Sequence, residues 1–269
     1  MKLNWLTLIA AAALVQACAT NPAGRTVVML IDDASMNQMG ATAFTELKQK
    51  TRVSGNATTS RYVSCVSRKL IAELPEQWRQ LPWEVVVFED DSPNAFALPG
   101  GKVGVHTGLL PIARTEDQLA AVIGHELAHV WLRHGAERVS QQFAAQAAMS
   151  AVQAYGNSQG GGTSDQVMAL IGAGAQVGVL LPFSRKHETE ADEWGQKFMA
   201  QAGYDPQAAA TLWGNMQAAS GKATPQFLSS HPSSSRRQQT LAEMAESSEL
   251  QGTLRAARAA GKRPDCGRP

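Results

Sequence analysis

The pattern His125-Glu126-x-x-His129 constrains this chain more than any other feature of its sequence. It lies in a segment with apolar residues at three- and four-residue steps, which predicts a buried helix. On a helix, residues four apart differ in direction by about 40°, so the two imidazoles project from one face. Two such nitrogens can hold half of a tetrahedral zinc shell. Glu126 points about 100° away from His125, where it can reach a reacting water but not the metal itself.

A short His-Glu-x-x-His match also occurs on exposed helices that carry two histidines. Here the flanking residues are apolar, and buried histidine and glutamate side chains are costly unless they are paired or bind a metal. His134 follows His125 by nine residues, points to the opposite side of the helix, and lacks the spacing of longer metal-binding motifs. We expect His134 to be a surface histidine near the end of the helix.

A third ligand is needed, and a charged cluster at residues 184–192 offers one. Glu188 and Asp192 are four residues apart at the start of a second predicted helix, so they point the same way. Glu188 can complete a His2Glu site, and Asp192 can accept the free ring N–H of a ligand histidine. The alternative is a solvated acidic first turn, which suits a helix N-terminus. Glu190 and Glu193 face elsewhere and fit that alternative better.

Several motifs occur in a defined order along the chain. They are Asn94-Ala95-Phe96-Ala97-Leu98-Pro99-Gly100-Gly101, then Thr107-Gly108-Leu109-Leu110, then the His-Glu-x-x-His helix, then Ser184-Arg185 with Glu188-x-Glu190-Ala191-Asp192. Together they resemble the CAAX prenyl protease / HtpX-like family of zinc metallopeptidases (peptidase family M48). The resemblance covers residues 60–245, and within the family the chain looks most like the small periplasmic lipoproteins of the BepA and LoiP kind.

This resemblance implies an α+β, mostly helical fold: an HExxH zincin-like (minigluzincin) domain with a small sheet beside the active-site helix. It implies one Zn2+ per chain, held by His125, His129 and Glu188. Carried over in the same way, Glu126 matches the catalytic glutamate. Asp192 matches the acidic residue that supports the site.

A His-Pro segment, with Arg237 six residues after His231, also resembles the family. In such a site His231 either donates a hydrogen bond to the oxyanion or sits over the zinc in a closed state. Arg237 either orients substrate or braces the site. The alternative is a simple His-Pro turn that starts a helix.

The sheet is predicted from two short runs, 84–89 and 102–107, which are joined by a turn-rich loop. The resemblance favours an edge strand beside the metal, where an extended substrate pairs by strand addition; its residues are Lys102, Val103, Gly104 and Val105. The alternative is an ordinary central strand. We expect His106 to be a strand side chain rather than a ligand.

The N-terminus has the shape of a secretory signal peptide, with Lys2 followed by an apolar run. Val15-Gln16-Ala17-Cys18 resembles a bacterial lipobox, whose cysteine becomes lipidated. The alternatives are an ordinary signal peptide or a short membrane anchor, although the run is shorter than the ~20 residues of a transmembrane helix. Ala19 rather than aspartate follows Cys18, which by resemblance to such signals favours the outer over the inner membrane. We therefore expect a periplasmic protein anchored to the membrane through Cys18.

The expected organisation is a signal peptide (1–17), a tether (18–40), a metallopeptidase domain (41–245) and a polar, mostly solvated tail (246–269). Thr115 is expected to cap the active-site helix. The apolar run at 165–181 is predicted to be a buried or gating helix rather than a membrane-inserted one, next to a glycine-rich loop that acts as a lid. Cys65 and Cys266 fit either a disulfide in an oxidising periplasm or two free thiols.

The predicted function is zinc-dependent endopeptidase activity on misfolded or unassembled envelope and outer-membrane proteins. The net charge of +1, without a basic patch, gives no indication of nucleic-acid binding. One alternative is a non-catalytic chaperone or assembly factor that binds unfolded outer-membrane proteins. Another is a purely structural zinc, which a closed shell of four protein ligands would indicate, because a catalytic site leaves one position for water.

Overall fold

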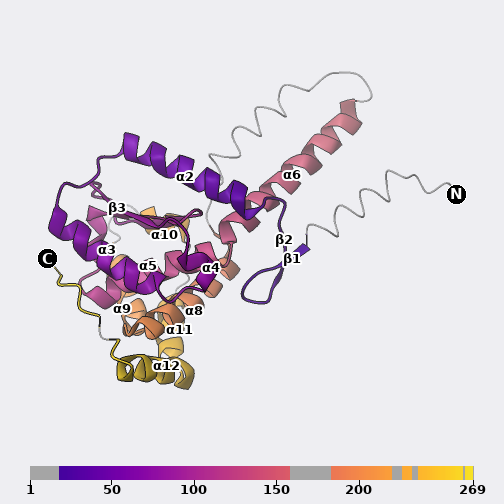
Figure 1. Ribbon diagram of the computed structural model, residues 1–269. Helices are drawn as coiled ribbons and strands as arrows, with labels where there is room; N and C mark the ends of the chain where they lie inside the picture. Colours follow the sequence, from indigo (N-terminus) through magenta and orange to yellow (C-terminus); the bar gives the residue numbers. More distant parts are fainter. Residues whose placement is uncertain (1–17, 158–182, 220–225, 232–235, 263, 269) are drawn as a thin grey trace. The chain divides into compact units, whose positions relative to one another are not determined.

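The fold is taken from a computed structural model, which describes residues 18–157, 183–219, 226–231, 236–262 and 264–268. The chain forms two compact units (Figure 1). The first unit combines residues 1–36 with 132–181, and the second combines residues 37–131 with 182–269. The predicted signal peptide, and the predicted lid loop and apolar helix beyond residue 157, lie outside the described residues.

Within the described residues, the second unit contains a mixed sheet of three strands, with helices on both of its faces. β5 (Lys102–His106) lies at its centre, parallel to β3 (Glu84–Phe88) and antiparallel to β4 (Ala95–Leu98). Phe88 and Leu98 pack against Phe44 of α2 (Asp33–Lys50) on one face. α3 (Ala57–Ile71) and α5 (Glu116–Trp131) contact the sheet from the other face (Figure 1). This mostly helical arrangement with a small sheet beside α5 is the predicted fold class.

The prediction that residues 102–105 form an edge strand is wrong, because β5 is paired on both sides. Gly104 allows close packing at the pair of β4 and β5: a Cβ there would lie 2.1 Å from Phe96 Cζ, so the bare backbone makes room for the ring of the neighbouring strand. The outer side of β3 is also covered, since the Ser54 N–H donates to the Val87 carbonyl at 2.8 Å. Among the described residues, the edge without a neighbouring strand is that of β4.

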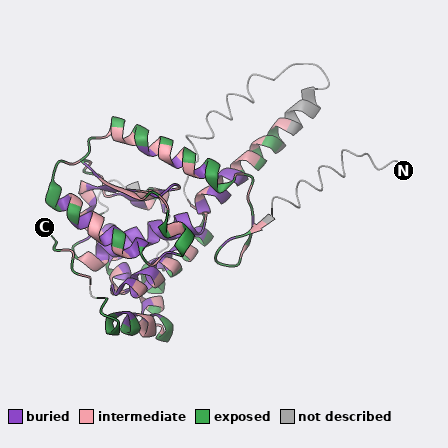
Figure 2. Ribbon diagram, in the orientation of Figure 1, coloured by how far each residue is buried: buried purple, intermediate pink, exposed green. Residues whose placement is uncertain are grey.

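The active-site helix α5 begins at a cap that the sequence predicted. Thr115 Oγ1 accepts a hydrogen bond from the Gln118 N–H at 3.2 Å, which satisfies one of the free donors of the first turn. From Gln118 to Trp131 every residue is buried (Figure 2). Trp131 near its end packs edge-on against Trp194, with ring centroids 4.2 Å apart. The helix that carries the two histidines is therefore fixed at both ends.

The partner of α5 is α8 (Arg185–Ala202), which begins after the N-cap Ser184. The two helices cross with almost no space between their backbones. A Cβ on Gly195 would lie 2.9 Å from the His125 backbone nitrogen, and one on Gly124 would lie 3.1 Å from the Gly195 carbonyl oxygen. This close approach sets the distance between the histidines of α5 and Glu188, two turns before the crossing on α8.

We expect Gly195→Ala to push the two helices apart, because the new methyl group meets backbone atoms that cannot rotate away. Overpacking of this kind costs about 1–3 kcal/mol of the free energy of unfolding. Gly252→Ala is the matched control, since Gly252 also lies within a helix and has open space where its Cβ would be. Denaturant unfolding should show a loss for the first variant and none for the second; equal midpoints would contradict the tight crossing.

The C-terminal segment contains a helix that packs against the domain, and most of its described residues are exposed, in line with the polar, mostly solvated tail that was predicted from residue 246. α12 (Ser248–Ala259) buries Leu250 and Leu254 against Ala200 of α8. These leucines are four residues apart and form a short apolar stripe that the surrounding polar residues obscure in the sequence. Cys266 then forms a disulfide with Cys65 of α3, across 201 residues of chain. A bond that closes so long a loop stabilises a fold by roughly 2–5 kcal/mol.

The remaining elements of the second unit are short. They are α4 (Glu76–Arg79), η1 (Thr107–Leu109), α9 (Ala208–Ala219), α10 (Gln226–Ser230) and α11 (Arg237–Ala245). α9 packs against both α5 and α11, so it lies behind the active-site helix.

The first unit pairs β1 (Cys18–Thr20) with β2 (Thr26–Val28) and adds α6 (His134–Asn157). Arg25, in the turn between the strands, donates two hydrogen bonds to the Glu137 carboxylate, at 2.7 and 2.6 Å. The segment predicted to be a tether is therefore folded onto α6, and α2 begins within it, at Asp33. His134 is fully buried, not a surface histidine, because it begins a second helix instead of ending the first. In the described part of the chain, no helix is long and apolar enough to cross a membrane.

Candidate active site

Among the described residues, one group of buried side chains has the composition of a metal site. Ligand-type atoms of His125, His129, Glu188 and His231 all lie within 4.8 Å of one another. His125 Nε2 lies 3.0 Å from His129 Nε2 and 3.4 Å from Glu188 Oε2. His129 Nε2 lies 3.5 Å from Glu188 Oε1. The structure thus brings the three predicted metal ligands together from α5 and α8.

His231 is the fourth member of this group. It follows α10, and its Nδ1 lies 3.0 Å from Glu188 Oε1 and 3.2 Å from His125 Nε2. Its ring stacks between Phe227 and Phe183, with centroid distances of 4.4 and 5.3 Å. Of the two positions expected for His231, the structure shows the one over the metal ligands.

Glu126 lies beside the group without belonging to it. Its Oε2 accepts a hydrogen bond from the Ala97 N–H of β4 at 3.3 Å, and its Oε1 lies 3.2 Å from His231 Nε2. Burial raises the pKa of Glu126, and the opposing charges of His231 and His125 only partly offset this effect. A carboxylate whose pKa is raised toward neutrality is suited to take a proton and give it back.

Arg237, the first residue of α11, binds two carboxylates of α8 at once. Its Nε and Nη2 donate to Asp192 at 2.8 and 2.7 Å, and its Nη1 donates to Glu188 at 2.6 Å. Asp192 Oδ1 in turn lies 3.0 Å from His125 Nδ1. These are the contacts expected of an arginine that braces the site, one of the two roles predicted for Arg237. Asp192 occupies the supporting position that the sequence predicted for it.

The protonation of the ligands follows from these contacts. Burial lowers the pKa of His125, but hydrogen bonds to Asp192 and Glu188 outweigh it and raise the pKa to about 9. Burial also raises the pKa of Glu188, but hydrogen bonds from His125, His129 and His231 hold it far below its usual range. Glu188 is therefore ionised, as a ligand must be, and a metal ion competes with a proton for His125.

The donor set fits zinc, which is bound in proteins by imidazole nitrogens and carboxylate oxygens. His125 and Glu188 also have partners that orient them, Asp192 and Arg237, as metal-binding side chains generally do. The other candidate from the sequence, His106, lies at the end of β5 with its Nδ1 3.0 Å from Ser92 Oγ, outside the group. It is the strand side chain that was expected.

Three aromatic residues of the site were missed by the sequence analysis. Phe183 and Phe227 enclose His231, and Trp213 of α9 lies against Arg237. Phe227 precedes His231 by four residues and so shares its side of the chain, which is a weak signal. Nothing in the sequence distinguishes Trp213 or Phe183 from ordinary core residues.

Residues 57–245 match the peptidase family M48. The chain belongs to this family. It is 44% identical over 181 residues to the mitochondrial metalloendopeptidase OMA1 of Schizosaccharomyces pombe, an alignment that covers 66% of this chain and 51% of that protein. It is 30% identical over 201 residues to the beta-barrel assembly-enhancing protease of Escherichia coli, covering 72% of this chain and 40% of that protein. The chain thus spans about half or less of the length of these M48 relatives.

Membership in M48 confirms the family that the sequence motifs predicted. It also bears on the alternative of a structural zinc. Four protein donors meet here, as in a closed site, and Glu126 lies beside them with its Oε1 3.2 Å from His231 Nε2. A structural zinc would use all four donors, whereas in a peptidase His231 would have to leave one position to water.

Proposed function

We propose that this member of M48 is a zinc-dependent endopeptidase of the bacterial envelope that degrades misfolded or unassembled envelope proteins, including those of the outer membrane. The observation that carries the proposal is the convergence of His125, His129 and Glu188 beside Glu126. These three side chains would hold one Zn2+. When bound, this ion lowers the pKa of a coordinated water and polarises the scissile carbonyl.

Glu126 is the general base and then the general acid. Its buried carboxylate takes a proton from the attacking water and passes it to the leaving amine. The Ala97 N–H holds one carboxylate oxygen, which leaves Oε1 on the side of the metal ligands. Arg237 and Asp192 keep His125 and Glu188 in place while this proton moves.

The open edge of β4 is suited to bind the substrate backbone. Since the Asn94 carbonyl accepts from the His106 N–H, alternate residues of β4 face β5, and Ala95 and Ala97 face away from it. The Ala97 N–H points at Glu126, so this edge borders the reacting groups. A peptide added to β4 would be bound through its main chain, which suits unfolded substrates of varied sequence.

Three observations support a location in the envelope. The N-terminal residues have the pattern of a lipoprotein signal ending at Cys18, and the Cys65–Cys266 disulfide suits an oxidising compartment. One M48 relative is named a beta-barrel assembly-enhancing protease. Other relatives are mitochondrial metalloendopeptidases, so the location of this protein is tested by cell fractionation.

After expression in a bacterium, the wild type should fractionate with the outer membrane and Cys18→Ala should not.

The proposed activity is tested with purified protein and an unfolded outer-membrane protein or casein. Cleavage should stop when a chelator removes metal and should return when zinc is added. Folded substrate protein should resist cleavage. Cleavage that persists in excess chelator would contradict the proposal.

A second candidate role is favoured by the position of His231, which meets both Glu188 and Glu126. Such a closed site would bind unfolded outer-membrane proteins without cleaving them until His231 moves away. We expect His231→Ala to raise the rate of casein cleavage while zinc binding through the other three ligands persists. If His231 instead donates to the oxyanion, the rate should fall by roughly 100-fold or more. The direction of the change decides between the two roles.

A further inference from the structure

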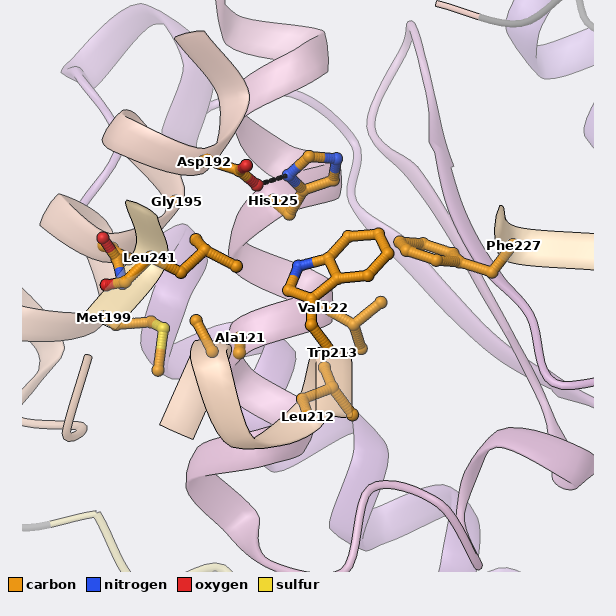
Figure 3. Close-up of a pocket in the computed structure, with 12 residues that line it drawn as sticks. Ala121, Val122, His125, Asp192, Gly195, Met199, Leu212, Trp213, Phe227 and Leu241 are labelled. Atoms are coloured by element: carbon orange, nitrogen blue, oxygen red, sulfur yellow. Dashed lines mark hydrogen bonds and ion pairs between the residues drawn. The ribbon is translucent and has the colours of Figure 1, made fainter. Parts of the chain in front are cut away.

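Trp213 of α9 makes a contact with the metal site that its position in the sequence does not suggest. The guanidinium of Arg237 lies over the Trp213 ring, 3.8 Å from its centroid. Both side chains are buried, at 5% and 6% exposure. Figure 3 shows Phe227 beside the indole, with the two ring centroids 5.6 Å apart.

The guanidinium held by this ring connects two carboxylates that have different tasks. Through Nη1 it fixes Glu188, a metal ligand, and through Nε and Nη2 it fixes Asp192, the partner of His125. A small rotation of the guanidinium plane would therefore displace two groups at once: the metal ligand Glu188, and Asp192, which orients the ligand His125. The planar fork can satisfy both carboxylates only in one orientation.

The hydrogen bonds lie in the guanidinium plane and leave its faces to other contacts, and the Trp213 ring against one of these faces resists rotation of the plane. An aromatic ring attracts the cation and also keeps water away from it. In a dry environment the bonds from Arg237 to both carboxylates are stronger than they are in contact with water. The cavity beside Trp213, which Asp192 and His125 also line, is only about 20 Å³, so the indole is closely packed (Figure 3).

We propose that Trp213 is a positioning residue of the metal site, which acts by holding the Arg237 guanidinium in the plane that fixes both Glu188 and Asp192. This inference rests on the metal site of the proposed function. It assigns to α9, which contributes no ligand, a direct influence on how tightly the metal is held.

The test measures zinc affinity by competition with a chromophoric chelator at fixed pH, not cleavage. Trp213→Leu keeps an apolar side chain but removes the ring, and zinc binding should weaken roughly tenfold, as for other residues that support a ligand. Trp213→Phe retains an aromatic face and should restore most of the affinity. In an Arg237→Gln background, Trp213→Leu should cause no further loss, because the cation that the ring holds is gone.

The matched control is Leu212→Ala, which removes a neighbouring buried side chain of α9 that lines the same cavity. It should lower the unfolding midpoint and leave zinc affinity unchanged. The inference is overturned if Trp213→Leu binds zinc as the wild type does, if Phe fails to rescue, or if the loss persists in the Arg237→Gln background. A wild type that binds no zinc would overturn the proposed function as well, so the two failures are distinguishable.

Discussion

Glu126→Gln is expected to abolish peptide cleavage while the protein still binds its metal. The amide has nearly the shape of the carboxylate, and its carbonyl oxygen can still accept the hydrogen bond from the Ala97 N–H. It cannot take a proton from water. Because Glu126 lies outside the group of ligand atoms, its replacement leaves His125, His129 and Glu188 in place. Loss of a general base lowers kcat by roughly 100- to 10,000-fold.

The measurement compares cleavage of casein and zinc content for the purified wild type and variant. Glu193→Gln is the control, since Glu193 is an exposed carboxylate of α8 that pairs with Lys197. It should cleave as the wild type does. A Glu126→Gln protein with wild-type activity would exclude the proposed mechanism. One without zinc would show that Glu126 also holds the metal.

Glu188→Ala is expected to lose the metal. This change removes one of three ligands, and the loss in affinity should exceed the ~100-fold that marks the upper range for supporting residues. It also leaves the buried Arg237 cation with Asp192 as its remaining carboxylate partner in the site. Removing one of the two carboxylates that pair with this buried cation is destabilising, so a lower unfolding midpoint should accompany the loss of zinc.

Asp192→Asn separates a ligand from a supporting residue. Asp192 touches His125 Nδ1 and Arg237 but is not part of the ligand group. The zinc affinity of Asp192→Asn should be roughly 10- to 100-fold lower than that of the wild type, and it should stay higher than that of Glu188→Ala. Chelator competition on all three proteins gives this order directly. Equal zinc affinities for the wild type and Glu188→Ala would show that Glu188 is not a metal ligand.

The ligands could be predicted from the sequence because helical spacing alone determines which side chains share a face. His125 with His129, and Glu188 with Asp192, are each one turn apart, so each pair needs only a helix to be brought together. The capping residue Thr115 was predictable for the same local reason. That the two helices meet was implied by the family resemblance, and the tight crossing at Gly195 provides the physical means.

Features that depend on contacts between distant segments were not predictable. The central position of β5 depends on pairing with two strands from other parts of the chain. The folded C-terminus depends on a stripe of two leucines and on a disulfide whose partners are far apart in the chain. Trp213 resembles a core residue, because its contact with Arg237 arises only when α9 and α11 pack together.

The central claim is that His125, His129 and Glu188 share one zinc ion, and anomalous diffraction at the zinc edge tests it most directly. A crystal of the purified protein should show one peak per chain, about 2.0–2.2 Å from one nitrogen of each histidine and one oxygen of Glu188. A crystal grown with zinc that has no peak at these side chains, or has its peak elsewhere, would contradict the account.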